Sequence, residues 1–124
     1  MDAKTIFVSG ASGYIAKHII LQLLEAGYRV RGSVRSLPSG EAARRDIAGA
    51  LSATDDIGDR LEFVALDLLR DEGWDEALKG TEALVHTASP FPLDQPRNRQ
   101  DLIRPAVEGT RRALRAARAA GISR

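Results

Sequence analysis

The stretch VSGASGYIAKHI, residues 8–19, joins an apolar run to a helical pattern through a turn that contains two glycines. Gly10 permits a tight turn, Gly13 lets another group come close to the backbone, and Ala16 keeps the new helix packed near the preceding strand. A helix N-terminus presents free N–H groups and about half a positive charge to an anion. Because the turn stands between a strand pattern and a helix pattern, it predicts a cradle for a pyrophosphate rather than a turn of purely geometric use.

Beyond this stretch, strand and helix patterns alternate along the sequence. Short apolar or alternating runs predict strands over residues 4–9, 28–35, 60–68 and 82–89. Apolar residues at helical spacing predict helices over residues 14–26, 41–51, 71–80 and 100–120, with a turn at 38–40. Strands separated by helices pair in parallel through right-handed crossovers. The order therefore predicts an α/β fold, a doubly wound parallel sheet with strand order 3-2-1-4.

Each long helix is expected to bury the face that carries its regularly spaced apolar residues. In the first helix this face comprises Ile15, Ile19, Leu23 and Ala26. In the second it comprises Ala42, Ala43, Ile47 and Leu51. In the last it comprises Ile103, Val107, Thr110, Leu114 and Ala117. Pro105 lies in the first turns of that last helix and predicts a late start or a kink there.

Length and composition limit the classes of function. The 124 residues are enough for one domain, and 44% hydrophobic and 28% charged residues are typical of globular proteins. A net charge of +1 gives no electrostatic basis for capturing nucleic acid or an anionic membrane, and the lack of cysteine excludes disulfides and thiolate metal sites. The apolar stretch 19–24 is too short to span a bilayer and no signal-peptide core follows Met1, so we expect a cytoplasmic location.

Arginines recur along the last predicted helix at positions 111, 115 and 118. Asp101 and Glu108 balance their charge, and no aromatic residues are interleaved among them. We therefore expect a solvated helix face there and no nucleic-acid partner.

The end of the second predicted strand indicates which dinucleotide the cradle would hold. In this fold the ribose 2′-oxygen meets the end of that strand, where an acidic residue would hydrogen-bond the 2′-hydroxyl of NAD. Arg35 occupies this place, Ser36 follows it, and the next acidic residue is Glu41. A guanidinium can donate two hydrogen bonds to a 2′-phosphate and has no comparable use for a hydroxyl. The sequence therefore favours NADP(H), the alternative being a solvated arginine at a strand end.

Further candidate residues follow the third and fourth predicted strands. Asp67 could accept a hydrogen bond from an adenine amino group, with Leu68 packed on the ring, or it could cap the turn after the strand. His86 is expected to be a core residue with satisfied hydrogen bonds rather than a base. The residues after it are small, as the close passage of a nicotinamide ribose requires: Thr87, Ala88 and Ser89.

Several segments together resemble a known family, the extended short-chain dehydrogenase/reductases. The similar segments are residues 8–36, FVALDLL (63–69), GWDEAL (73–78), VHTASPFP (85–92) and DLIRPAVEGT (101–110). Within the family, the resemblance is to the branch that contains dihydroflavonol reductase, cinnamoyl-CoA reductase and microbial aldehyde or ketone reductases. It implies a Rossmann fold, NADPH as hydride donor and reduction of a small-molecule carbonyl to an alcohol.

The same resemblance implies a role for each candidate residue. The pyrophosphate side would contact Gly10, Ser12, Gly13, Tyr14 and Ile15. The 2′-phosphate would lie on Arg35, the adenine on Asp67 and Leu68. The nicotinamide half would lie on Thr87, Ala88 and Ser89.

The sequence also departs from the family's pattern. Ala16 stands in place of the third glycine, and no basic residue closely follows Arg35, which leaves the second ligand of the 2′-phosphate open. The family's catalytic serine and Tyr-x-x-x-Lys pair, in which the tyrosine gives the proton, are missing, since the only tyrosines are Tyr14 and Tyr28. We therefore expect residues 1–124 to be an NAD(P)-binding Rossmann domain truncated before the catalytic half and inactive by itself.

Three functions are compatible with this sequence. The first is an NADPH-dependent oxidoreductase that reduces an aldehyde or ketone, with this chain as its cofactor-binding part. The second is a non-catalytic, redox-sensing NADP-binding module, which the lack of a downstream Tyr-x-x-x-Lys would favour. A sugar-nucleotide epimerase or dehydratase fits less well, because those enzymes resemble the chain less over residues 85–92. In each case we expect the unpaired outer edge of the fourth strand to be open to self-association.

Overall fold

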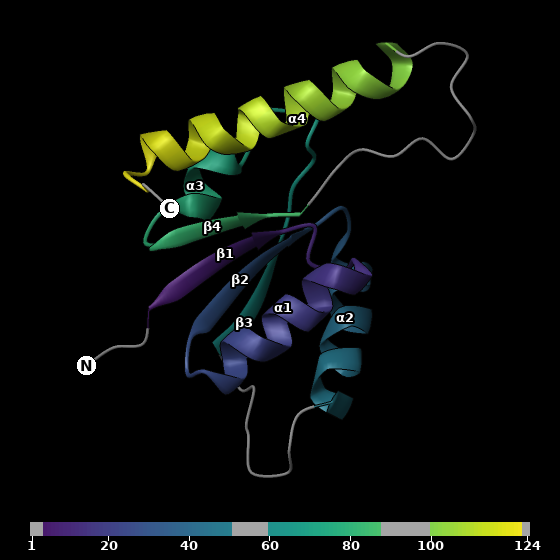
Figure 1. Ribbon diagram of the computed structural model, residues 1–124, viewed down its shortest axis with the longest axis vertical. Coiled ribbons are helices and arrows are strands. Elements are labelled where there is room, and N and C mark those ends of the chain that lie inside the picture. Colours follow the sequence, from purple (N-terminus) through teal and green to yellow (C-terminus); the bar gives the residue numbers. More distant parts are fainter. Residues whose placement is uncertain (1–3, 51–59, 88–99, 123–124) are drawn as a thin grey trace.

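The structure, a computed structural model, describes residues 4–50, 60–87 and 100–122, with the backbone alone for residues 100–106. Strands and helices alternate along the chain in the order β1 (Thr5–Ser9), α1 (Tyr14–Glu25), β2 (Arg29–Val34), α2 (Leu37–Ala50), β3 (Leu61–Ala65), α3 (Trp74–Leu78), β4 (Ala83–His86) and α4 (Gln100–Ala119). The strands pair in parallel in the order β3-β2-β1-β4. The predicted doubly wound α/β fold and its 3-2-1-4 order are therefore confirmed (Figure 1).

The sheet carries a layer of helices on each face. α1 and α2 cover one face, and α3 and α4 cover the other (Figure 1). Consecutive residues of β1 point to opposite faces, so Val8 packs with α1 and α2 while Phe7 packs against Trp74 of α3, with ring centroids 6.5 Å apart. Phe7 and Val8 are both fully buried, as expected for the centre of a parallel sheet.

The buried face of α1 is not the predicted one. Ala16, Ile20 and Leu24 are buried, and Ala16 belongs to the same apolar cluster as Val8 of β1. The residues predicted to be buried are instead exposed or half-buried: Ile15, Ile19, Leu23 and Ala26. α1 carries apolar residues on two adjoining stripes, so their spacing alone fits either face. The turn that leads in from β1 selects between the stripes, because it sets the rotation of the first helical turn.

α4 likewise buries a different face from the predicted one. Among the side chains of α4 that the structure describes, the buried residues are small ones, Gly109, Ala113, Ala116 and Ala117, of which only Ala117 was predicted. Val107 is 42% and Leu114 58% exposed, and the side chain of residue 103 lies outside the described part. Small residues face inward because α4 packs closely on α3 and on Leu68, which precedes α3 in the chain. Of the two effects predicted for Pro105, the late start is wrong, since α4 begins at Gln100 and runs through Pro105, and the kink stays a prediction.

α2 begins earlier than predicted, at Leu37, so the turn expected at residues 38–40 is its first turn instead. Proline fits there because the first N–H groups of a helix have no intrahelical acceptor. Gly40, Ala43 and Ile47 are buried, Ala42 is exposed, and residue 51 lies outside the described residues. A Cβ atom on Gly40 would lie 2.9 Å from Cγ of Phe63, so α2 approaches β3 closely at this point.

Three elements fall short of one predicted bound by three residues. β3 ends at Ala65, after which the chain turns at Asp67, whose Oδ1 accepts the N–H of Leu69 at 2.9 Å. α3 begins only at Trp74, after Gly73 with a φ of 84°. β4 ends at His86, and residues 88 and 89 of the predicted strand lie outside the described residues.

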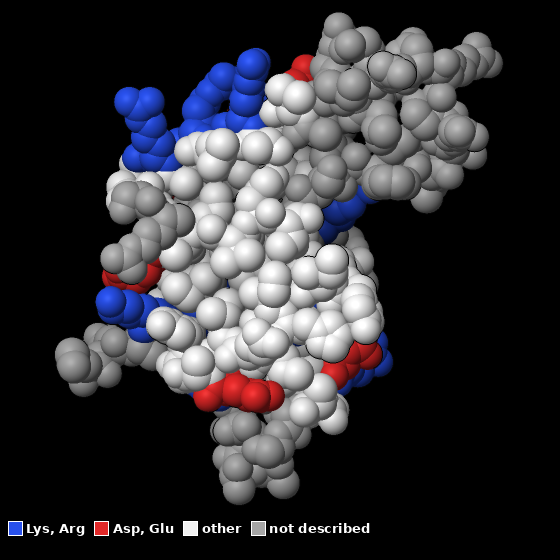
Figure 2. All heavy atoms as spheres, viewed as in Figure 1, with Lys and Arg blue, Asp and Glu red and all other residues white. Residues whose placement is uncertain are grey.

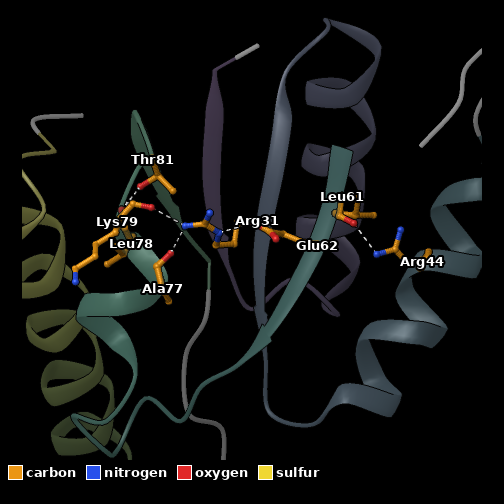
Figure 3. A network of polar contacts seen from close by, with 8 residues as sticks. All are labelled: Arg31, Arg44, Leu61, Glu62, Ala77, Leu78, Lys79 and Thr81. Atoms are coloured by element: carbon orange, nitrogen blue, oxygen red, sulfur yellow. Dashed lines mark hydrogen bonds and ion pairs between the residues drawn. The ribbon is translucent and has the colours of Figure 1, made fainter. Parts of the chain in front are cut away.

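The side chain of Arg31 joins β2 to β3 and to α3 (Figure 3). Its Nε donates to Oε1 of Glu62 at 2.6 Å, and its Nη1 donates to the carbonyl oxygens of Ala77 and Lys79 at 2.7 Å each. The last carbonyls of a helix have no intrahelical donor. Arg31 therefore caps the C-terminus of α3.

Basic side chains gather on the outward side of α4 (Figure 2), where the exposed arginines are Arg111, Arg115 and Arg118. No helix in the part of the chain that the structure describes has the length and apolar character needed to cross a membrane.

Candidate functional site

A cavity of about 660 Å³ opens at the carboxyl ends of the strands. Its walls come from the β1–α1 turn, the end of β2, the chain after β3, Trp74 and Thr87. The predicted site residues within the described part all line it: Gly10, Ser12, Gly13, Tyr14, Ile15, Arg35, Asp67, Leu68 and Thr87. The predicted residues Ala88 and Ser89 lie outside the described residues.

The β1–α1 turn, residues 10–13, is held in shape by β2. Gly10 adopts a φ of 70°, which favours glycine, and its N–H donates to Oγ of Ser33 at 3.1 Å. The N–H of Ala11 donates to the carbonyl oxygen of Ser33 at 2.8 Å. Ser33 is a site residue that was not predicted from the sequence. The available signal was a small hydroxyl residue beside Gly32 and near Arg35 on the same strand.

The start of α1 presents unused hydrogen-bond donors to the cavity. The N–H of Gly13 donates to the carbonyl oxygen of Gly10 at 3.0 Å, but the N–H groups of Ser12, Tyr14 and Ile15 have no acceptor within the described ranges. Gly13 occupies the N-cap position without a side-chain cap, and the first turn of α1 contains no acidic residue. The positive end of the helix is therefore open to an anion.

A second positive group lies where β2 ends. Arg35 is exposed, lines the cavity, and has no ion-pair or hydrogen-bond partner among the residues that the structure describes. α2 begins two residues later, at Leu37, again with no acidic residue in its first turn. The hydroxyls of Ser36 and Ser39 lie 2.9 Å apart at this helix start. This end of the cavity thus combines a guanidinium, a helix N-terminus and two hydroxyls.

Asp67 and Leu68, which follow β3, form another part of the cavity wall. The carboxylate of Asp67 accepts the N–H of Leu69, which is the turn-capping role that the sequence allowed. Its main-chain oxygen accepts the indole N–H of Trp74 at 3.1 Å, and Trp74 is only 2% exposed. Trp74 therefore fixes the main chain at Asp67, and all three residues, Asp67, Leu68 and Trp74, line the cavity.

Thr87 is tied to the end of β1. Its N–H donates to Oγ of Ser9 at 3.0 Å, and its hydroxyl donates to the carbonyl oxygen of Ser9 at 2.5 Å. The same Ser9 Oγ lies 2.7 Å from Nδ1 of His86. Burial lowers the pKa of His86, and its Nε2 atom is buried without a hydrogen-bond partner among the residues that the structure describes. His86 is therefore half-buried, with one ring nitrogen in contact with Ser9, and it differs from the expected core residue with satisfied hydrogen bonds.

These groups can bind and orient an elongated anionic ligand. Free N–H groups lie at the middle of the cavity, Arg35 at one side and Thr87 at the other. Tyr14 is 76% exposed and stacks edge-on against His18, with ring centroids 4.7 Å apart. In the described part of the chain, no tyrosine–lysine pair stands beside Thr87 to supply a proton.

Comparison with known proteins relates the whole chain to one family. The family described as NAD dependent epimerase/dehydratase matches residues 6–124. Cinnamoyl-CoA reductase 1 of Petunia hybrida is 34% identical over 125 residues, which cover 100% of this chain and 34% of that protein. Dihydroflavonol 4-reductase of Hordeum vulgare is 32% identical over 118 residues, covering 94% of this chain and 31% of that protein.

A solved structure shows the same relation. The yeast methylglyoxal/isovaleraldehyde reductase Gre2 complexed with NADPH superposes with a TM-score of 0.73 and 30% identity, over 91% of this chain and 32% of that one. The chain thus spans about a third of the length of these relatives.

Proposed function

The chain belongs to the NAD dependent epimerase/dehydratase family, as its resemblance to extended short-chain dehydrogenase/reductases predicts, and from this premise we propose that it is the NADPH-binding part of a reductase. The whole protein would reduce an aldehyde or ketone to an alcohol. One observation carries the proposal: the uncapped start of α1, the guanidinium of Arg35 and Thr87 all face one cavity at the carboxyl edge of the sheet.

The chain's own residues would hold the dinucleotide in the orientation that the resemblance implies. The free N–H groups of Ser12, Tyr14 and Ile15 would donate to the pyrophosphate, and Asp67 with Leu68 would support the adenine. Thr87 would lie beside the nicotinamide half, followed by Ala88 and Ser89. When bound, the nicotinamide supplies the hydride, a chemistry that no side chain provides.

Arg35 would select NADPH over NADH by pairing with the 2′-phosphate. Its exposed guanidinium has no competing partner in the described ranges, so it can turn to a phosphate without breaking another contact. The start of α2 supplies the second ligand that the sequence left open, since its N–H groups and the hydroxyls of Ser36 and Ser39 lie next to Arg35 in the chain.

Proton transfer and substrate choice would fall to other parts of the protein. Tyr14 is the only tyrosine at the cavity, but it lies at the start of α1, with His18 rather than lysine four residues later. We therefore ascribe to residues 1–124 the role of the dinucleotide-binding domain. If the full-length protein bound NADPH but carried no Tyr-x-x-x-Lys, it would be the redox-sensing module instead.

Titration with NADPH and NADH tests the proposal. We expect the unmutated chain to prefer NADPH at least tenfold, because a charge-assisted contact contributes about 1.5–3 kcal/mol. Arg35→Asp should reverse the preference, while Arg118→Asp, an exposed arginine on α4, should leave it unchanged. Equal affinity of the unmutated chain for the two dinucleotides would contradict the proposal.

A further inference from the structure

The chain between β3 and α3, residues 66–73, forms the wall of the cavity that carries Asp67 and Leu68. We call this segment the β3–α3 loop. Little of it is held by strand pairing, since β3 ends at Ala65 and only the N–H of Leu66 still donates to β2, to the carbonyl oxygen of Val34 at 2.9 Å. Within the loop, the N–H groups of Leu69 and Arg70 donate to Asp67 and shape its turn. Contacts from outside the loop then set where this turn lies relative to the sheet.

Arg112 of α4 supplies two of those contacts. Its Nη1 donates to the carbonyl oxygen of Leu68, and its Nε donates to Oδ1 of Asp71 at 2.6 Å. The side chain of Arg112 is 19% exposed, whereas that of Asp71 is 85% exposed. An exposed ion pair contributes little by itself, so the bond to the main chain of Leu68 is the more important one. Arg112 thus ties the loop to α4, and it is not itself among the residues that line the cavity.

Gly109 brings α4 close enough for this contact. It is buried one helical turn before Arg112, and a Cβ atom at its position would lie 3.2 Å from Cβ of Leu68 and 3.3 Å from Cδ2. Any larger residue would displace Leu68 or push α4 away. The loop is therefore in contact with α4 through Gly109 and Arg112 and with α3 through the indole of Trp74.

We propose that Arg112 and Gly109 are positioning residues for the adenine side of the cofactor site. Through them, α4 fixes the β3–α3 loop so that Asp67 and Leu68 present the wall on which the adenine rests. The inference rests on the proposed function, because it assigns that wall to the adenosine half of the dinucleotide. The alternative is that Arg112 and Gly109 only attach α4 to the rest of the fold.

Two variants of α4, each with a matched control, separate these roles. Arg112→Met removes both hydrogen bonds, and Arg111→Met removes the neighbouring exposed arginine. Gly109→Ala adds a Cβ against Leu68, and Gly49→Ala on α2 adds one that meets nothing within 4 Å. In both variants, alanine favours the helix more than the glycine that it replaces. If Gly109 only attached α4 to the fold, Gly109→Ala would therefore leave ligand binding unchanged.

The probe for the site is adenosine 2′,5′-bisphosphate, measured by calorimetry. Arg112→Met should weaken its binding by about tenfold, the effect of losing a charge-assisted hydrogen bond, and Gly109→Ala by about threefold. Both controls should bind within twofold of the unmutated chain. Gly109→Ala should weaken binding while its midpoint of thermal unfolding stays well above the temperature of the binding measurement, a combination that a loss of folding cannot produce.

Trp74 provides a second measurement that needs no ligand. It is the only tryptophan of the chain, and its indole donates to the loop at Asp67, so its fluorescence reports on the loop directly. Acrylamide should quench Trp74 more strongly in Arg112→Met than in Arg111→Met. If the unmutated chain did not bind the probe, the proposed function would fail. If the unmutated chain bound the probe but both α4 variants equalled their controls in affinity and in quenching, this inference would be overturned. If Arg112→Met did not fold, Gly109→Ala alone would decide.

Discussion

Ser33 supports the β1–α1 turn from the neighbouring strand through two hydrogen bonds, one to Gly10 and one to Ala11. Because Ser33 is 4% exposed, Ser33→Ala would leave the N–H of Gly10 without an acceptor where little water reaches. We expect the free energy of unfolding to fall by about 1–3 kcal/mol and NADPH binding to weaken. Urea unfolding measures the first effect. Ser36→Ala, an exposed serine, is the control for stability alone, because its hydroxyl belongs to the proposed 2′-phosphate site. Equal stability of the two variants would contradict the role given to Ser33.

A substitution at Gly13 tests whether the β1–α1 turn is the phosphate cradle. A Cβ atom there would lie 3.3 Å from the carbonyl oxygen of Gly10, and the larger valine would stand where the pyrophosphate is proposed to lie. Gly13 has a φ of −73°, so the backbone does not require glycine and the fold should survive. We expect Gly13→Val to abolish NADPH binding while circular dichroism shows nearly unchanged helix content. Binding within a few-fold of the unmutated chain would mean that the phosphates are held elsewhere.

His86 makes stability depend on pH. Burial lowers its pKa from the ordinary value of 6.5, so the unfolded chain takes up the proton at a higher pH than the folded chain. The free energy of unfolding should therefore fall as the pH drops through about 6.5 and below. His86→Asn keeps an acceptor for Ser9 and should flatten this part of the curve, while His18→Gln, on the exposed side of α1, should not. Urea unfolding between pH 8 and pH 5 checks this, and an unchanged slope in His86→Asn would rule it out.

Arg31 of β2 secures the short helix α3 to the sheet (Figure 3). Its side chain is 23% exposed and makes three charge-assisted hydrogen bonds. We expect Arg31→Met to lower the free energy of unfolding by about 2 kcal/mol, because two helix carbonyls and Glu62 lose their donor. Lys79→Met removes only an exposed pair with Glu76 and should cost less than about 1 kcal/mol. Comparable losses in the two variants would show that Arg31 is not the cap of α3.

Element order and type were predictable because alternation of strands and helices allows few topologies. Which face of each helix turns toward the sheet was not predictable in the same way. α1 carries two apolar stripes, and the one that contains Ala16 is chosen by the incoming turn, which the spacing of Ile15 and Ile19 does not encode. In α4 the spacing of Val107 and Leu114 predicted that large residues form the buried face. Because α4 packs closely on Leu68, the buried face is instead formed by Gly109 and the alanines.

At the scale of the whole molecule, the cavity could be located from sequence because parallel strands bring their carboxyl ends to one edge. The turn at Gly10, Arg35 after β2, and Asp67 after β3 share a cavity for that reason. Ser33 and Arg112 were not identified, because their contacts join segments separated by 23 residues in one case and 44 in the other, with no local pattern to mark them. Sequence thus located the residues that face the cavity better than those that hold them.

The whole chain should bind NADPH without turning it over. A positioned acid–base group contributes about 10²- to 10⁴-fold to a rate, and neither Tyr14 nor His86 stands in for the tyrosine–lysine pair. Tyr14 lies at the start of α1, and His86 does not line the cavity. NADPH oxidation with a series of aldehydes should equal the rate in buffer.

The same chain should also self-associate, because in the described part β4 pairs only with β1 and its other edge can accept a strand from a second copy. Sedimentation velocity over a range of concentrations should show species larger than a monomer, increasing with concentration. Self-association depends on the edge of β4, and turnover depends on a proton donor. The sedimentation result and the NADPH-oxidation result therefore test two independent predictions. A concentration-independent monomer would show that the edge of β4 is covered by the chain itself, and aldehyde-dependent oxidation of NADPH would show that a proton donor lies within these 124 residues.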